Sequence, residues 1–183
     1  MPAGRPARRA APDDDDAALL ARTAAGDRDA FATLIGRWER RFYGVAQRML
    51  GERRDAEDAV QRAFLRVFVK ARTYGDAWPA GSWLYRVVTN VCVDALRKRR
   101  AEPVTSEAVV ERAAAPSRTL ERLDLDAAIA RLPVEARTIL VLRYAEDLPY
   151  DEIARVRGIS INTVKTQLRR ATLALRRRLV EEP

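Results

Sequence analysis

The stretch "DEIARVRGISINTVKTQLRRA" (residues 151–171) decides the fold of the second half of the chain. Ile153 and Ala154 sit in a short helical segment, a glycine follows four residues after Ala154, and Val164 lies in the next helical segment. This spacing is typical of a helix-turn-helix, because a small residue lets the helices cross closely, glycine makes the turn, and a β-branched residue fills the gap. Ser160 is placed to cap the second helix. The stretch therefore predicts a helix-turn-helix unit.

The second helix of this motif has an apolar stripe and a basic face. On a helical wheel, the apolar stripe consists of Ile161, Val164, Leu168, Ala171, Leu175 and Leu179. The opposite arc carries the basic residues Lys165, Arg169, Arg170, Arg176 and Arg177, and the polar residues Asn162, Thr163, Thr166 and Gln167 lie among them. No acidic residue occurs between Ser160 and Val180. A solvated face usually mixes both signs of charge, whereas a single-sign face with amide and hydroxyl groups near the helix start suits the major groove of DNA. The pattern favours DNA binding over a merely solvated surface.

The rest of the chain also follows helical spacing. Apolar residues recur every three or four positions, and no alternating strand pattern persists. We predict a helix that starts near residue 13 and further helices over 27–50, 54–72, 83–100, 120–132, 134–147, 150–156 and 161–182. Residues 101–119 hold two prolines, small residues and no aromatic side chain, which indicates a linker. The expected fold class is all-α: two small helical domains joined by a flexible linker, the C-terminal one a helix-turn-helix. The expected boundaries are a disordered tail over 1–12, domains over 13–100 and 119–183, and the linker over 101–118.

The composition excludes several classes of protein. The chain has 183 residues, a formal net charge of +8, no histidine and one cysteine. Common zinc sites and Ser-His or Cys-His nucleophile pairs cannot be built from it, and no phosphate-binding glycine loop is present, so we expect no enzyme, no metal and no cofactor. The single Cys92 fits a reducing cytoplasm. With no signal peptide or apolar span in the sequence, we expect a cytoplasmic protein without membrane insertion, and the basic charge favours nucleic acid as a partner.

The helix over 54–72 carries apolar residues on two faces. Val60, Phe64, Val67 and Phe68 form the face expected to be core. Leu65 and Val69 lie on a different face, rimmed by Asp58, Gln61 and Arg62. An apolar strip with a polar rim suggests a protein contact, but a second core layer explains the same pattern equally well.

The helix over 83–100 combines a packed arc with a polar one. The packed arc consists of Trp83, Leu84, Val87, Val88, Val91 and Ala95, and Asp94 is expected on the same side. The other arc consists of Arg86, Thr89, Asn90, Val93, Arg97 and Arg100. The second arc is a ridge of donors without a carboxylate. The preceding loop, residues 73–82, contains Tyr74 and Trp78, and aromatic side chains can stack on unpaired bases.

Three motifs in this order resemble a bacterial sigma factor of the sigma-70 family, in the small extracytoplasmic-function (ECF) group. "DAEDAVQRAFLRVF" is similar to the family's polymerase-binding helix, "WLYRVVTNVCVDALRKRR" to its −10 promoter helix, and "LPVEARTILVLRYAEDLPYDEIARVRGISINTVKTQLRRA" to its −35-binding domain. The resemblance covers residues 27–179 apart from the linker. It implies promoter-specific transcription initiation with core RNA polymerase, −35 and −10 recognition and assistance in DNA melting.

The resemblance also implies roles for individual residues and partners. The residues expected to bind polymerase are Asp58, Gln61, Arg62 and Leu65. Those expected to bind and melt the −10 element are Tyr74, Trp78, Arg86, Asn90 and Arg97. Those expected to bind the −35 element are Thr163, Lys165, Thr166, Arg169 and Arg170. The implied partners are the β′ clamp helices and the β flap of core polymerase, promoter DNA and an anti-sigma factor. Whether Trp78 or Tyr74 receives a flipped base is open. The rival interpretations are a repressor that binds DNA alone through the same motif, and an enzyme, which no carboxylate cluster supports.

Overall fold

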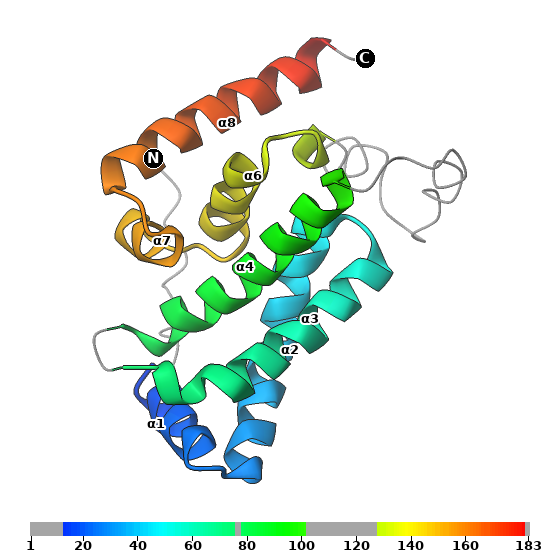
Figure 1. Cartoon of the computed structure of the whole chain (residues 1–183). Helices are drawn as coiled ribbons and strands as arrows, with labels where there is room; N and C mark the ends of the chain where they lie inside the picture. The colour runs from blue at the N-terminus through cyan, green and yellow to red at the C-terminus, as the bar shows by residue number, and fades with distance from the viewer. Residues whose placement is uncertain (1–12, 76–77, 102–127, 182–183) are drawn as a thin grey trace, which may run out of the picture.

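The computed structural model describes residues 13–75, 78–101 and 128–181, and every regular element in these ranges is helical (Figure 1). The elements are α1 (Asp13–Ala24), α2 (Arg28–Leu50), α3 (Arg53–Lys70), the 3₁₀ turn η1 (Ala71–Thr73), α4 (Ala80–Ala101), α6 (Val134–Leu140), the π-helical turn η3 (Val141–Ala145), α7 (Tyr150–Arg157) and α8 (Ile161–Glu181). The predicted all-α class is confirmed. The predicted tail over 1–12 and, apart from Ala101, the predicted linker over 101–118 lie outside the described residues.

The first unit, α1 to α4, is built around the apolar side of α2. Leu34, Trp38, Phe42 and Met49 of this helix recur at helical spacing and are all fully or almost fully buried. Phe42 stacks on Phe64 of α3 with ring centroids 4.8 Å apart. Burial of such large side chains is the main source of stability for the unit, since each contributes on the order of 1.5–3 kcal/mol.

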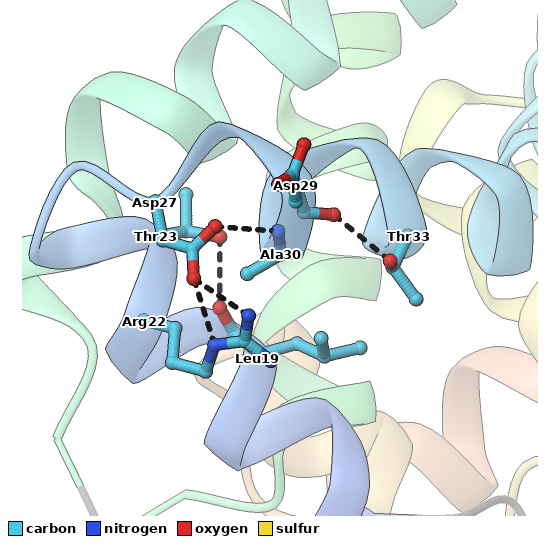
Figure 2. A network of polar contacts seen from close by, with 7 residues as sticks. All are labelled: Leu19, Arg22, Thr23, Asp27, Asp29, Ala30 and Thr33. Carbon is cyan, nitrogen blue, oxygen red and sulfur yellow. Dashed lines mark hydrogen bonds and ion pairs between the residues drawn. The ribbon is translucent and has the colours of Figure 1, made fainter.

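The turn between α1 and α2 is fixed by side-chain capping (Figure 2). The Asp27 carboxylate accepts the Ala30 backbone N–H at 2.9 Å, as an N-cap does, and also accepts the Arg22 Nε–H at 2.8 Å. The Ala30 N–H and Arg22 lower the pKa of Asp27. Gly26 has a φ of 93°, which permits the tight reversal. The reversal folds α1 against α2, and there the buried Asp16 accepts the Trp38 indole N–H at 2.9 Å.

The second unit contains the predicted helix-turn-helix. Gly158 ends α7 in the left-handed conformation with a φ of 67°, and the Ser160 hydroxyl accepts the Thr163 backbone N–H at 3.0 Å. Ile153 of α7 and Val164 of α8 are completely buried. The predicted helices over 150–156 and 161–182 are confirmed to within a residue at each end. The predicted helix over 134–147 is interrupted by η3, where the backbone widens into a π-helical turn.

The two units pack against each other. Helix α4 contacts α2 and α3 on one side and α6 and α7 on the other, and α2 also contacts η3 (Figure 1). The Tyr85 hydroxyl donates to the Glu146 carboxylate at 2.7 Å across this boundary, and Arg137 donates to the Met49 carbonyl at 2.6 Å. The sequence pattern predicted two independent units; the described residues form two units with a shared interface.

Candidate nucleic-acid interface

Helix α8 presents its basic side chains to solvent. Lys165, Thr166, Arg169 and Arg170 are exposed, and none of them forms an ion pair with another described residue. Thr163 is half-buried, and its backbone N–H and its hydroxyl both contact the capping Ser160 hydroxyl, the latter at 2.8 Å. The predicted −35 residues therefore lie together within the first three turns of one helix.

The opposite side of α8 anchors the helix. Val164, Leu168 and Ala171 are buried, and α8 contacts both α6 and α7. Ile161, the first residue of the helix, was predicted to belong to this stripe but is 43% exposed. The buried stripe fixes the rotation of α8 about its axis, so the basic face is held outward.

The predicted donor ridge of α4 is only partly exposed. Asn90 and Arg97 are exposed and Arg86 is half-buried. Thr89 and Val93 were predicted on the ridge but are buried, and the Thr89 hydroxyl donates to the Tyr85 carbonyl at 2.7 Å. The prediction failed at these two positions because both sides of α4 are covered by other helices.

Asp94 and Trp83 also differ from the predictions for this helix. Asp94 was expected on the packed side but is exposed, and its carboxylate pairs with Arg66 of α3 at 3.0 Å. Trp83, expected in the packed arc, is half-buried at the edge of the core. The ion pair between Asp94 and Arg66 joins α3 to α4 at the surface, where it contributes little stability.

The loop before α4 brings its aromatic side chains against the basic ridge. The Tyr74 hydroxyl donates to the Trp78 carbonyl at 2.8 Å, and its ring meets Trp83 edge-on at 5.7 Å between centroids. The Arg86 guanidinium lies 5.1 Å from the centre of the Trp78 ring, which is within the range of a cation–π contact. An aromatic ring beside a guanidinium is an arrangement that can receive an unpaired base and its phosphate.

Helix α3 exposes the predicted apolar strip. Leu65 is 64% exposed and Val69 is 74% exposed, while Asp58, Gln61 and Arg62 beside them are exposed too. The second-core-layer interpretation of Leu65 and Val69 is therefore wrong.

Phe68 enlarges this strip. It was predicted to face the core but is 42% exposed, and it contacts Phe31 of α2 with ring centroids 5.0 Å apart. The helical wheel places it at the edge of the buried arc. We refer to Leu65, Phe68 and Val69 as the α3 strip.

An open hollow of 600 Å³ lies between α2 and α3 next to Gln61. Its lining includes Glu39, Arg40 and Tyr43 of α2 and Arg53 of α3, which the sequence analysis did not single out. Only the contact between α2 and α3 brings these polar residues beside the predicted polymerase face.

Within residues 13–75, 78–101 and 128–181, no group of three His, Cys, Asp or Glu side chains is arranged to hold a metal ion. In the same ranges no helix is both long enough and apolar enough to cross a membrane. The buried Cys92 thiol has its pKa raised to about 12 by burial.

Two family profiles match the chain in the order of its two units. The profile described as Sigma-70 region 2 matches residues 34–102, and the one described as Sigma-70, region 4 matches residues 122–175. Among solved structures, the chain is similar to that of CnrH in complex with the cytosolic domain of CnrY, with a TM-score of 0.72 and 25% identity over 93% of this chain and 100% of that one.

Curated relatives agree with these profiles. The chain is 33% identical over 170 residues to the ECF RNA polymerase sigma factor SigW of Bacillus subtilis, covering 84% of this chain and 91% of SigW. It is 34% identical over 165 residues to the ECF RNA polymerase sigma factor SigM of Mycobacterium tuberculosis, covering 90% of this chain and 84% of SigM. The chain therefore belongs to the ECF group of the sigma-70 family, whose members are non-enzymatic subunits of RNA polymerase that direct promoter recognition and transcription initiation.

Proposed function

We propose that the chain divides promoter recognition among three of its surfaces. The basic face of α8 reads the −35 element, α4 with the loop before it binds and helps to melt the −10 element, and the α3 strip binds core polymerase. The observation that carries the proposal is the α8 face, where a capped and anchored helix presents exposed cations on a stretch of sequence, residues 160–180, that contains no acidic residue. Such a helix matches the recognition helix of a helix-turn-helix protein.

The −35 role is assigned to the N-terminal half of α8. Residues near the start of a recognition helix reach base edges, whereas residues further along meet the phosphate backbone as the helix leaves the groove. Lys165, Thr166 and Arg169 are exposed near the start and are assigned to bases. Arg170 is assigned to phosphate, and so is Thr163, because it is half-buried and its hydroxyl contacts the capping Ser160 hydroxyl. Because their amines, guanidinium groups and hydroxyls can all donate hydrogen bonds, they suit acceptors on purines and on phosphate.

The −10 role is assigned to Arg86, Asn90 and Arg97 along α4 and to the adjoining loop. Strand opening requires that unstacked bases be held, and a flipped base stacks on an aromatic side chain. Trp78 is favoured over Tyr74 as the platform, because the Tyr74 hydroxyl already holds the loop through the Trp78 carbonyl and the Trp78 ring lies against Arg86. A base on Trp78 would have the Arg86 guanidinium within reach of its phosphate.

The polymerase role is assigned to the α3 strip and its rim. An exposed apolar patch with a polar border is typical of a protein interface. Asp58, Gln61 and Arg62 form the border next to Leu65, and the β′ clamp helices are the proposed partner. The second unit is proposed to bind the β flap. With polymerase and chromosomal promoters as partners, the proposed compartment is the cytoplasm.

An inhibitory protein partner is also proposed. The CnrH structure, whose match covers 93% of the present chain, was solved in complex with the cytosolic domain of CnrY. We infer that this chain likewise binds an anti-sigma factor, in keeping with the expectation from its sequence.

The test is reconstituted transcription. The chain is added to core RNA polymerase with fragments of genomic DNA, and the start sites of the transcripts are mapped. Defined start sites that appear only when both proteins are present support the proposal. Tight, specific DNA binding by the chain alone, without new transcripts, would instead indicate a repressor-like protein.

A further inference from the structure

Leu173 of α8 is an exposed apolar residue in the middle of a basic surface. Its side chain is 48% exposed. The residues three and four positions before and after it are all arginines and are all exposed: Arg169, Arg170, Arg176 and Arg177. Residues at these spacings are neighbours on a helix surface, so the four arginines surround the leucine. None of the four forms an ion pair with another described residue.

The leucine lies on the side of α8 that points away from the protein. Val164 is completely buried, and Leu173 follows it by nine residues, which is about two and a half turns of helix, so the two side chains point in opposite directions. The helices on which α8 packs, α6 and α7, lie on the same side of it (Figure 1). An isolated exposed leucine is ordinary on a protein surface. Leu173 is unusual because it lies opposite the buried stripe and among cations.

Leu173 also continues a row of exposed residues that begins at the start of α8. Asn162, Thr166, Arg169 and Leu173 follow one another at intervals of three or four residues and therefore share one side of the helix. The row is about 16 Å long at about 1.5 Å per residue, which corresponds to about five base pairs at about 3.4 Å each. A helix that brings Thr166 and Arg169 to base edges therefore brings Leu173 to the end of the same stretch of major groove.

Duplex DNA suits this surface better than a protein partner does. Residues 160–180 contain no acidic residue, so the partner itself has to neutralise the four guanidinium groups around the leucine. Duplex DNA carries one negative charge for about every 1.7 Å of its axis, and its phosphates line both edges of the groove. The one methyl group that the standard bases present in the major groove is the C5-methyl group of thymine.

We propose that Leu173 is a further residue that determines −35 specificity, and that it selects thymine by contacting the C5-methyl group of that base. The inference rests on the proposed −35 role of α8. The arginines beside Leu173 bind phosphates at the groove edges, and the leucine excludes water from the methyl group between them. Burial of one methyl group against an aliphatic side chain changes an affinity about fourfold.

Two truncations, one on the DNA and one on the protein, test the contact. Deoxyuridine differs from thymidine only in lacking the C5-methyl group. Leu173→Ala shortens the side chain at an exposed helical position, where alanine is also a good helix former. Ile161→Ala is the matched control, because Ile161 is 43% exposed on the same helix but lies about a third of a turn from Leu173 around the axis.

The measurement is made with holoenzyme reconstituted from core RNA polymerase and the full-length chain. A promoter is selected from a library with a randomised −35 region, and each of its −35 thymines is then replaced in turn by deoxyuridine. For the unmodified chain and for Ile161→Ala, one of these replacements should weaken promoter binding about fourfold. Leu173→Ala should bind the thymine promoter about fourfold more weakly and should lose nothing further when that thymine is replaced. Circular dichroism should show the same helix content in all three chains.

The methyl contact is refuted if no −35 position prefers thymine, or if Leu173→Ala is as sensitive to deoxyuridine as the unmodified chain. The second result includes a Leu173→Ala chain that binds thymine and deoxyuridine promoters more weakly by separate, additive amounts, in which case Leu173 meets the DNA backbone or a protein partner instead.

Arg169→Ala on the same promoters keeps these outcomes distinct from a failure of the proposed function. If Arg169→Ala changes the preferred −35 sequence although Leu173→Ala shows no coupling to a methyl group, α8 reads the −35 element and the role proposed for Leu173 is wrong. If Arg169→Ala has no effect, the −35 assignment of α8 is wrong, and the role of Leu173 falls with it.

Discussion

Replacing Leu65 with aspartate should separate polymerase binding from folding. Leu65 is 64% exposed in the free chain, so its substitution should change the free energy of unfolding by no more than about 0.5 kcal/mol. Full burial of a leucine contributes on the order of 1.5–3 kcal/mol, of which about two thirds, ~1–2 kcal/mol, is still available to an interface. Leu65→Ala should therefore weaken binding about 5- to 30-fold. Leu65→Asp should weaken it further, because it places an unpaired carboxylate in the interface.

The neighbouring residue supplies the contrast. Phe64 is 7% exposed and stacks on Phe42, so Phe64→Ala should lower the free energy of unfolding by about 3–5 kcal/mol. Ala21→Asp places the same charge on an exposed position of α1 outside the strip and serves as the control for charge. Affinity is measured by competition between labelled and unlabelled chains for core polymerase, and stability by thermal unfolding. Unchanged affinity of Leu65→Asp, or a loss of stability like that of Phe64→Ala, would refute the reasoning.

Three further predictions concern the DNA-binding parts. Trp78→Ala should spare closed-complex formation but reduce strand opening, at a cost of about 1–3 kcal/mol for a lost stacking contact; permanganate reactivity of promoter thymines measures this, and unchanged reactivity would shift the role to Tyr74. Lys165→Ala or Arg169→Ala should change which sequences are used in a randomised −35 library, whereas Arg176→Ala should weaken all promoters equally and flatten the salt dependence; the reverse pattern would mean that α8 lies differently in the groove. Ser160→Ala should lower the stability of the second unit by about 1 kcal/mol through loss of its N-cap, visible as a lower melting temperature, and an unchanged melting temperature would argue against that cap.

The parts of the fold that could be predicted are those fixed by local interactions. Asp27 and Gly51 bound α2 as expected, because a capping carboxylate and a glycine with positive φ act on residues only a few positions away. The same holds for Gly158 and Ser160 in the helix-turn-helix. The exposure of the proposed −35 face could be predicted from the apolar stripe of α8, because burial of that stripe turns the opposite side of the helix toward solvent.

The parts that could not be predicted depend on contacts between distant segments. Arg137 lies in an apolar segment where a single arginine gives no periodic signal, yet it is buried, and a carbonyl 88 residues earlier in the chain accepts a hydrogen bond from it that offsets the cost of burial. Val93 had the spacing of an exposed ridge residue, but α4 is covered on both sides. A helical wheel assumes one covered side, and α4 violates that assumption because it contacts α2 and α3 and also α6 and α7. A helix that packs between two sets of helices has to keep apolar residues on more than one side, so the apolar Val93 lies on the same arc as Arg86 and Arg97.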